Sequence, residues 1–277
     1  MLTHDCPATL TDTEVLEFCK NGYLMLPGVV SEEINQRTLA YTDTNTSHEP
    51  TEIIQEPWFR DEVLLNPAVA GAVRSLLGAH FALPNLMSSH RMETPAPAQG
   101  WHRDGGSHYT HELHYLQVFY LPQTCTDDMG PTEVLPGSHF LFATSPTMGH
   151  YGAIQGMVKT SAPAGSVFLT VYSIWHRRGA SRIPSVRQLL KYNYWRTTPP
   201  TRDWRIETDF DLANAPYHLS GAPTFRPQFR DSRDSARMFF WLCGMDGKFR
   251  TMGGQGWPMP AKFEERPYGY PLAPERV

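Results

Sequence analysis

Residues 164–195 read AGSVFLTVYSIWHRRGASRIPSVRQLLKYNYW, and this stretch decides the fold class. Two apolar runs rich in β-branched and aromatic residues flank the polar segment RRGASRIPS, which contains a glycine and a proline. Such runs, bounded by turn residues, are typical of β-strands. We expect two strands, with His176 at the end of the first and Arg187 near the start of the second. These strands could be antiparallel neighbours, although the loop between them is too long to fix a register.

Shorter runs of the same kind recur after residue 80. They are HFALPNLMSS (80–89), HYLQVFYLP (114–122) and TEVLPGSHF (132–140). Several short strands separated by Pro, Gly and Ser predict an antiparallel sandwich or barrel.

The chain before residue 80 has a helical pattern. Thr11 and Glu14 form the signature of a capping box, which opens a short helix that we expect to end at Gly22. Further helices are expected over 31–41 and 67–78, with one strand over 22–30. The first eighty residues are therefore predicted to be mostly helical.

The domain organisation follows from these patterns. We expect a single domain over residues 1–277, because no linker interrupts it. Its parts are a helical N-terminal region (about 11–80), a β-barrel core (about 80–196) and an irregular C-terminal extension (about 197–277) with one possible helix near DSARMFFWLCG.

The composition limits the classes of protein. The four cysteines form no CxxC pair, and no apolar run is long enough for a transmembrane helix. Without a secretory signal, the protein is predicted to be cytoplasmic and not membrane-bound. A pI near 6.3 and scattered basic residues disfavour nucleic acid as a partner. Basic residues are concentrated after residue 177, which indicates either solvated surface or a funnel for anionic small molecules.

WHRDGG (101–106) carries a possible metal-binding pair. On an extended segment, His102 and Asp104 point to the same face. Two histidines and one carboxylate form the facial triad of non-haem Fe(II) oxygenases, and His176 is the candidate third ligand. Each member has an ordinary alternative, since an isolated HxD is usually not a metal pair and His176 could be a core histidine.

Arg187 lies eleven residues after His176. Its guanidinium offers a planar fork of donors that suits a carboxylate. It could equally pair with one of the many acidic residues of the chain.

The chain resembles the phytanoyl-CoA dioxygenase superfamily of Fe(II)/2-oxoglutarate oxygenases over about residues 14–196. The resemblance is carried by GYLMLPGVVS (22–31), WHRDGG, MGPTEVLPGSH (129–139) and AGSVFLTVYSIWHRRGAS (164–181). It implies a mainly β fold with flanking helices, a double-stranded β-helix (jelly-roll, cupin-like) barrel.

The resemblance also implies the site residues. His102, Asp104 and His176 would bind Fe(II), and Arg187 would bind the distal carboxylate of 2-oxoglutarate. Gln99 and Thr132 stand where relatives often place polar contacts to this cosubstrate, although Gln99 could be an exposed loop amide and Thr132 a turn residue. O2 would be the second cosubstrate.

The implied activity is oxidation of a C–H bond in a small-molecule substrate, possibly in secondary metabolism, while 2-oxoglutarate is decarboxylated to succinate. Hydroxylation is the default outcome. Desaturation, cyclisation, epoxidation or epimerisation would need the same cofactors. Halogenation is disfavoured, because relatives that halogenate replace the carboxylate of Asp104 with a small residue.

Two other classes stay open. The chain could be a non-catalytic jelly-roll protein that binds a metal or ligand, or a zinc hydrolase that uses the same three ligands. His108, His111 and His114 could form a second metal site, but they fit loop or sheet-face positions better. Trp101, Tyr109, Trp175 and Trp195 are candidate pocket walls, and the sequence does not predict the oligomeric state.

Overall fold

The strands after residue 80 combine with two from the N-terminal region. The strands are β1 (Thr3–His4), β2 (Tyr23–Leu26), β3 (Phe81–Ala82), β4 (Ser88–Ala96), β5 (Tyr115–Leu121), β6 (Thr132–Val134), β7 (Val158–Lys159), β8 (Ser166–Val171), β9 (His176–Arg178) and β10 (Ser181–Trp195). The computed structural model describes residues 1–105, 110–141, 143, 145–219 and 228–246.

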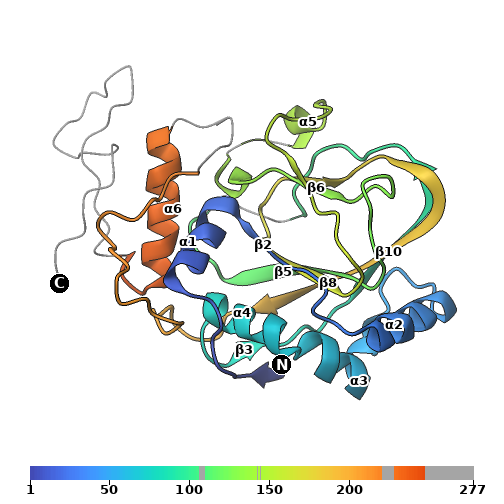
Figure 1. Ribbon diagram of the computed structural model, residues 1–277, viewed down its shortest axis with the longest axis horizontal. Helices are drawn as coiled ribbons and strands as arrows, with labels where there is room; N and C mark the ends of the chain where they lie inside the picture. Colours follow the sequence, from blue (N-terminus) through green and yellow to red (C-terminus); the bar gives the residue numbers. More distant parts are fainter. Residues whose placement is uncertain (106–109, 142, 144, 220–227, 247–277) are drawn as a thin grey trace.

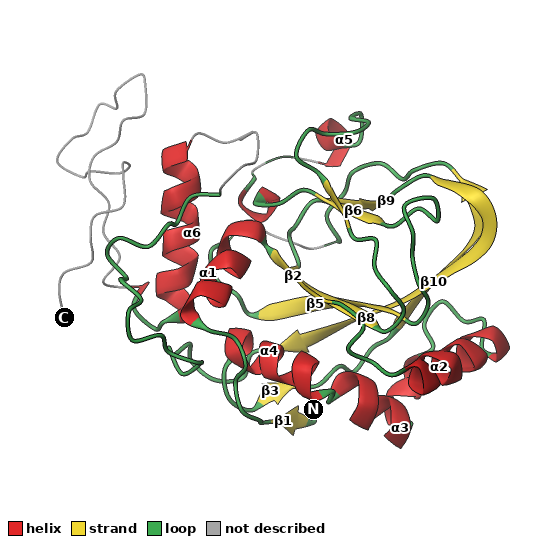
Figure 2. Cartoon of the chain, in the orientation of Figure 1, coloured by secondary structure: helices red, strands yellow, loops and turns green. Residues whose placement is uncertain are grey.

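These strands form two antiparallel sheets (Figures 1 and 2). The larger sheet has the order β1–β3–β10–β5–β8–β2, with β4 also paired to β10. The smaller sheet has the order β7–β6–β9. The prediction of a mainly β architecture with flanking helices is confirmed.

The helices are α1 (Asp12–Asn21), α2 (Glu32–Thr44), α3 (Pro57–Phe59), α4 (Pro67–Leu77), α5 (Ser145–Met148) and α6 (Gln228–Leu242), with short 3-10 and π turns at Thr51–Gln55, Arg60–Leu64 and Ser138–Phe140. Helices α2, α3 and α4 lie along the side of the larger sheet away from the smaller sheet, α1 and α6 lie at one end, and α5 lies near the smaller sheet (Figure 1). One apolar cluster joins residues of α1, α4, β5, β8 and α6.

The predicted start and end of α1 are confirmed. The Thr11 hydroxyl accepts from the Glu14 amide at 3.3 Å, and the Glu14 carboxylate accepts from the Thr11 amide at 2.8 Å. Gly22 ends the helix at a φ of 79°, a left-handed conformation that favours glycine.

Two predictions about the stretch 164–195 are wrong. The strands β8 and β10 are not neighbours, because the apolar β5 lies between them and pairs with both. His176 does not end a long strand but begins β9, since the chain turns after Val171 and crosses from the larger sheet to the smaller one. Periodicity alone did not reveal this turn inside an apolar run.

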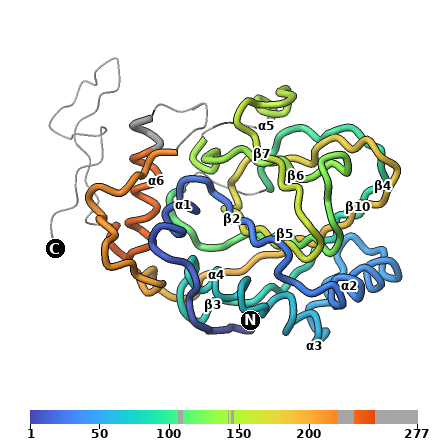
Figure 3. The backbone as a smooth tube through the Cα atoms, viewed as in Figure 1, coloured from blue at the N-terminus to red at the C-terminus, as the bar shows by residue number. Residues whose placement is uncertain are grey.

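The long strand β10 pairs with different strands along its length. Its first part pairs with β4 and its second part with β5, and a shift in register occurs between Ser181 and Ser185. The shift coincides with Pro184, which cannot donate a ladder hydrogen bond. Figures 2 and 3 show that β10 bends strongly as it runs between the sheets.

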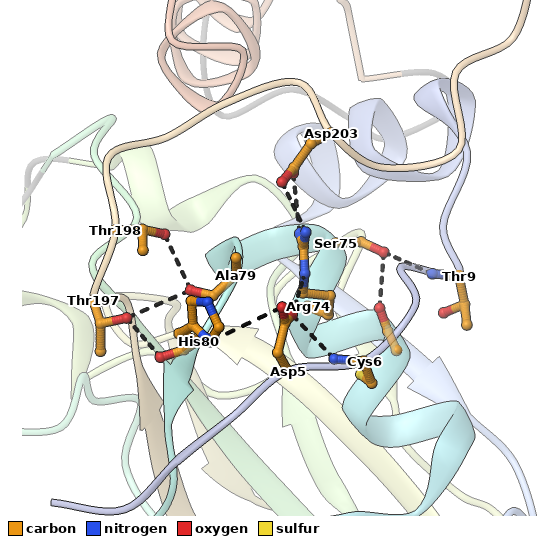
Figure 4. A network of polar contacts seen from close by, with 11 residues as sticks. Asp5, Cys6, Thr9, Arg74, Ser75, Ala79, His80, Thr197, Thr198 and Asp203 are labelled. Carbon is orange, nitrogen blue, oxygen red and sulfur yellow. Dashed lines mark hydrogen bonds and ion pairs between the residues drawn. The ribbon is translucent and has the colours of Figure 1, made fainter.

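Arg74 on α4 holds the N-terminal segment and the segment after β10 against the helical layer (Figure 4). Its guanidinium donates to Asp5 at 2.8 Å and forms a bidentate ion pair with the Asp203 carboxylate at 2.8 and 3.1 Å. Nearby, Thr197 and Thr198 donate to the carbonyl oxygens that follow α4. The segment after β10 is therefore held against α4 although it contains little regular structure.

The C-terminal region was predicted to be irregular with one possible helix, and α6 confirms the helix. Phe239 on α6 is fully buried and contacts the rings of Trp204, Phe210 and Tyr217. This packing joins α6 to the apolar core beside α1. The prediction that residues 1–277 form one domain stays a prediction.

Asp12 at the start of α1 anchors the same region. It is fully buried and accepts from Arg202 at 2.7 and 2.8 Å, from the Trp204 indole and from the Glu207 amide. Burial opposes ionisation, but these donors hold the pKa of Asp12 below its ordinary value. The carboxylate therefore stabilises the fold above about pH 4, and this contribution is lost as the pH falls further.

We predict that Asp12→Ala lowers the free energy of unfolding by about 3 kcal/mol, because it leaves the half-buried Arg202 and a buried indole without their acceptor. Denaturant unfolding measures the change. Asp61→Ala is the matched control, since the Asp61–Arg60 pair is exposed to solvent and contributes little to stability. A loss below about 1 kcal/mol for Asp12→Ala would contradict this account.

Candidate active site

The backbones of His102 and His176 form an antiparallel bridge. Each residue donates its amide hydrogen to the carbonyl oxygen of the other, at 3.0 Å in both directions. This bridge places the two imidazole rings side by side, with centroids 4.6 Å apart. The extended conformation that was expected for the HxD segment is therefore supplied by a bridge to β9 and not by a strand of its own.

The ring orientation leaves a lone pair on each histidine. The Nδ1 atom of His102 lies 2.9 Å from the Gly100 carbonyl, and the Nδ1 atom of His176 lies 3.1 Å from the Ile174 carbonyl. A carbonyl oxygen only accepts, so Nδ1 carries the proton and Nε2 carries the lone pair. The Nε2 atom of His176 is buried without a hydrogen-bond partner in the described residues.

Asp104 completes a group of three donors. One ligand atom from each of His102, Asp104 and His176 lies within 4.8 Å of the others, and this is the sole such group that does so in the described parts of the chain. The Asp104 Oδ2 atom lies 3.7 Å from the His176 Nε2 atom. Two imidazole nitrogens and one carboxylate fit a divalent transition metal with coordination positions left open.

Charged and polar neighbours keep the donors in the states that bind a metal. Burial opposes ionisation of Asp104, but the Lys191 ammonium, 2.5 Å away, and a hydrogen bond from Gln117 lower the pKa of this carboxyl to about 2. Burial, together with Lys191, lowers the pKa of His176 to about 3. His176 is therefore neutral in mildly acidic solution and need not release a proton to coordinate a metal.

Arg187 lies on β10 and is almost completely buried. One of its nitrogens donates to the Thr132 hydroxyl at 3.0 Å, whereas its Nε atom has no hydrogen-bond partner in the described part of the chain. Burial lowers the pKa of this guanidinium, and no carboxylate in the described residues pairs with it. A buried guanidinium without an anion is a site prepared for a carboxylate ligand.

Of the two predicted polar contacts to the cosubstrate, Thr132 is buried and Gln99 is exposed. Thr132 is a buried residue of β6, not a turn residue, and it holds Arg187. Gln99 lies in an exposed loop, where its side-chain oxygen accepts from the Arg178 amide at 3.1 Å. Arg178 itself has a buried Nε atom without a hydrogen-bond partner among the residues that the structure describes, so it is a further donor beside Arg187.

One cavity of about 350 Å³ brings these residues together. It lies between the two sheets, because its wall includes Phe119 from β5 and His176 from β9. We call it the arginine pocket and define it by the residues His102, Asp104, His176, Gln99, Thr132, Arg178, Arg187 and Lys191. All six residues predicted from the sequence line it.

Sequence reasoning missed Lys191, Gln117 and Arg178. A signal was present for Lys191, since it stands four residues after Arg187 and a strand puts both on one face. Gln117 could not be found in this way, because β5 is apolar on both faces and only its pairing with β10 reveals the role of this amide.

The other residues singled out from the sequence are the candidate aromatic pocket walls and the three additional histidines. Trp101 and Trp175 are buried in a core cluster and do not line the arginine pocket, whereas Tyr109 lies outside the described residues. His111 contacts Asp246, and His114 contacts Glu112. His108 also lies outside the described residues.

Solved structures share this architecture. HygX from Streptomyces hygroscopicus, with nickel and 2-oxoglutarate bound, is 17% identical, with a TM-score of 0.56, over 78% of this chain and 98% of that chain. The non-haem α-ketoglutarate-dependent carbocyclase SnoK from nogalamycin biosynthesis is 18% identical, with a TM-score of 0.54, over 72% of this chain and 90% of that chain. The epimerase SnoN from the same biosynthesis is 15% identical, with a TM-score of 0.53, over 66% and 82%.

The predicted jelly-roll fold is thus confirmed, and fold and donor set together define a non-haem Fe(II)/2-oxoglutarate-dependent enzyme. The model of the phytanoyl-CoA dioxygenase family (PhyH) matches residues 18–188. The chain belongs to this family, whose members act on small molecules with Fe(II) and 2-oxoglutarate as cofactors. No curated protein sequence matches the chain. In the described part of the chain, none of the helices combines the length and apolar character needed to cross a membrane.

We predict opposite effects of Lys191→Met on stability and on metal binding. The metal-free protein should melt at a lower temperature, because Asp104 loses its counter-charge. Its affinity for Mn(II) should rise about 10-fold, because a positive charge near the cation site is removed. Calorimetry and electron paramagnetic resonance of free Mn(II) measure the two effects.

Lys159→Met is the control, since Lys159 pairs with Asp127 outside the arginine pocket. Weaker Mn(II) binding in Lys191→Met would show instead that Lys191 is needed to orient the Asp104 carboxylate as a ligand.

Proposed function

We propose that the protein hydroxylates a C–H bond of a small-molecule substrate, with His102, Asp104 and His176 as the Fe(II) ligands. One observation supports the proposal above all. A single cavity is lined by the imidazoles of His102 and His176, by the Asp104 carboxylate and by the buried Arg187, which has no carboxylate partner in the described residues. The reaction converts substrate, O2 and 2-oxoglutarate into hydroxylated substrate, succinate and CO2. Iron(II), when bound, supplies the oxygen activation that couples the two oxidations.

The protein residues supply binding and orientation. The carbonyls of Gly100 and Ile174 fix both imidazoles in the tautomer that coordinates through Nε2. Arg187, held by Thr132, binds the distal carboxylate of 2-oxoglutarate, and Gln99 and Arg178 line the same pocket. Phe119 and Leu189 supply apolar walls there, which exclude water from the reacting end of the cosubstrate.

The alternatives are less well supported. A zinc hydrolase needs a general base near the metal-bound water, yet Asp104 is the single carboxylate among the described residues that line the arginine pocket. A non-catalytic protein that binds only a metal gives no reason for a buried Arg187 that has no carboxylate partner in the described residues. Desaturation, cyclisation, epoxidation and epimerisation would use the same residues. The neighbours SnoK and SnoN, a carbocyclase and an epimerase, keep these outcomes open for the present chain.

We also propose that residues 1–277 act as one oxygenase domain, that the protein is cytoplasmic and that its partner is a small molecule from secondary metabolism. The relation of SnoK and SnoN to nogalamycin biosynthesis supports the last point.

We predict that Arg187→Met weakens 2-oxoglutarate binding about 100-fold, because it removes the buried guanidinium that donates charge-assisted hydrogen bonds to the distal carboxylate. Binding of Ni(II) to the same variant should change less than 3-fold, since Arg187 is not among the three metal donors. Calorimetric titration of the Ni(II)-loaded protein with 2-oxoglutarate measures the first effect. Arg182→Met, an exposed position on the same strand, is the control. Equal loss of Ni(II) and 2-oxoglutarate binding would count against this assignment.

A further inference from the structure

A second pocket adjoins the arginine pocket. It has a volume of about 370 Å³ and shares Ser88, His90, Asp104 and Lys191 with the first pocket, but not Arg187. We call it the amide pocket, because the side-chain amides of Asn85, Gln117 and Asn193 line it. Its described lining is Glu49, Asn85, Leu86, Ser88, His90, Asp104, Gly105, Gln117, Tyr172, Lys191, Tyr192, Asn193 and Trp195.

The alternation of β10 explains why the two pockets are contiguous. Arg187, Leu189 and Lys191 line the arginine pocket, and Lys191, Asn193 and Trp195 line the amide pocket. Every second residue of a strand faces the same side, at a rise of about 3.3 Å per residue. One face of β10 therefore runs from the cosubstrate arginine, past the metal ligand Asp104, into the amide pocket.

Two side-chain amide oxygens in this pocket accept no hydrogen bond from any described residue. Gln117 and Asn193 are paired across β5 and β10, and the side-chain oxygen of each is buried without a hydrogen-bond partner in the described residues. Gln117 cannot turn its amide around, because its nitrogen donates to the Asp104 carboxylate, which only accepts. Buried acceptors that stay unpaired cost stability, so their presence beside a metal ligand indicates a ligand that donates to them.

The other lining residues indicate how polar that ligand is. Leu86 is the one aliphatic side chain among the described lining residues, which also include the aromatic rings of Tyr172 and Trp195. Such a wall offers little apolar surface to a long acyl chain. It suits a compact molecule with several O–H or N–H donors and C–H faces that pack on aromatic rings.

We propose that the amide pocket binds the organic substrate and that this substrate is a polyol or an amino polyol rather than an acyl thioester. Its hydroxyl or amino groups donate to Gln117 and Asn193, which present the neighbouring C–H bond at Asp104. This inference rests on the proposed function, since Asp104 must hold the iron for the pocket to be catalytic.

The test uses the full chain loaded with Ni(II) and 2-oxoglutarate, which does not turn over. Saturation-transfer NMR is recorded with three probes, namely myo-inositol, glucosamine and octanoate. We expect at least one of the first two to bind and octanoate not to bind. Asn193→Leu, a change of nearly equal shape, should weaken that binding 10-fold or more and leave the 2-oxoglutarate affinity unchanged.

The melting temperature distinguishes a binding role of Asn193 from a structural one. Replacing an unpaired buried acceptor with an apolar group should leave the melting temperature unchanged or raise it. Asn214→Leu, outside both pockets, is the matched control for the binding measurement. A lower melting temperature of Asn193→Leu, or probe binding equal to wild type, would overturn the assignment.

The two proposals fail in different ways. If wild type binds 2-oxoglutarate but neither polyol, or binds octanoate instead, the amide pocket is not the site proposed and the oxygenase assignment stands. If a polyol binds with the expected dependence on Asn193 but 2-oxoglutarate does not bind, the proposed function is wrong and the pocket assignment stands.

Discussion

The reciprocal hydrogen bonds between the backbones of His102 and His176 are the constraint on which the site depends. They join a loop that follows β4 to the first residue of β9, and so connect two segments that are far apart in the sequence. Because both imidazoles then donate from Nδ1 to local carbonyls, their Nε2 lone pairs are left for a metal beside Asp104. Main-chain contacts thus orient the two imidazoles, whereas the side chains of Lys191 and Gln117 hold the Asp104 carboxylate.

The second organising element is β10, which carries groups for three tasks on one face. In the proposed function Arg187 binds the carboxylate of 2-oxoglutarate, while Lys191 balances the charge of Asp104 and Asn193 offers an acceptor in the amide pocket. The ion pair of Lys191 and Asp104 stands at the junction of the two pockets. Before a metal binds, the ammonium supplies the positive charge that a buried carboxylate requires. The proposed sites for the cosubstrate, the metal and the substrate are therefore aligned along a single strand.

The sequence predicted much of the fold and the site, for identifiable reasons. Helix α1 was predictable because Thr11, Glu14 and Gly22 are local signals, and the HxD motif with His176 and Arg187 resembled a known family. The neighbours of β8 and β10 were not predictable, because strand pairing depends on β5, a distant apolar segment that carries no register signal of its own. Gln117 was missed for a related reason, since its contact with Asp104 joins β5 to the loop after β4 and no local pattern signals it.

The most direct test of the central claim is an anaerobic titration of metal-free protein, first with Fe(II) and then with 2-oxoglutarate, followed by visible absorption. The account predicts a weak metal-to-ligand charge-transfer band that appears only when both are present. The band should be absent in His176→Ala, which removes one of the bridged histidines. Folded wild-type protein that gives no band and retains zinc tightly instead would contradict the account and favour the hydrolase or the non-catalytic alternative.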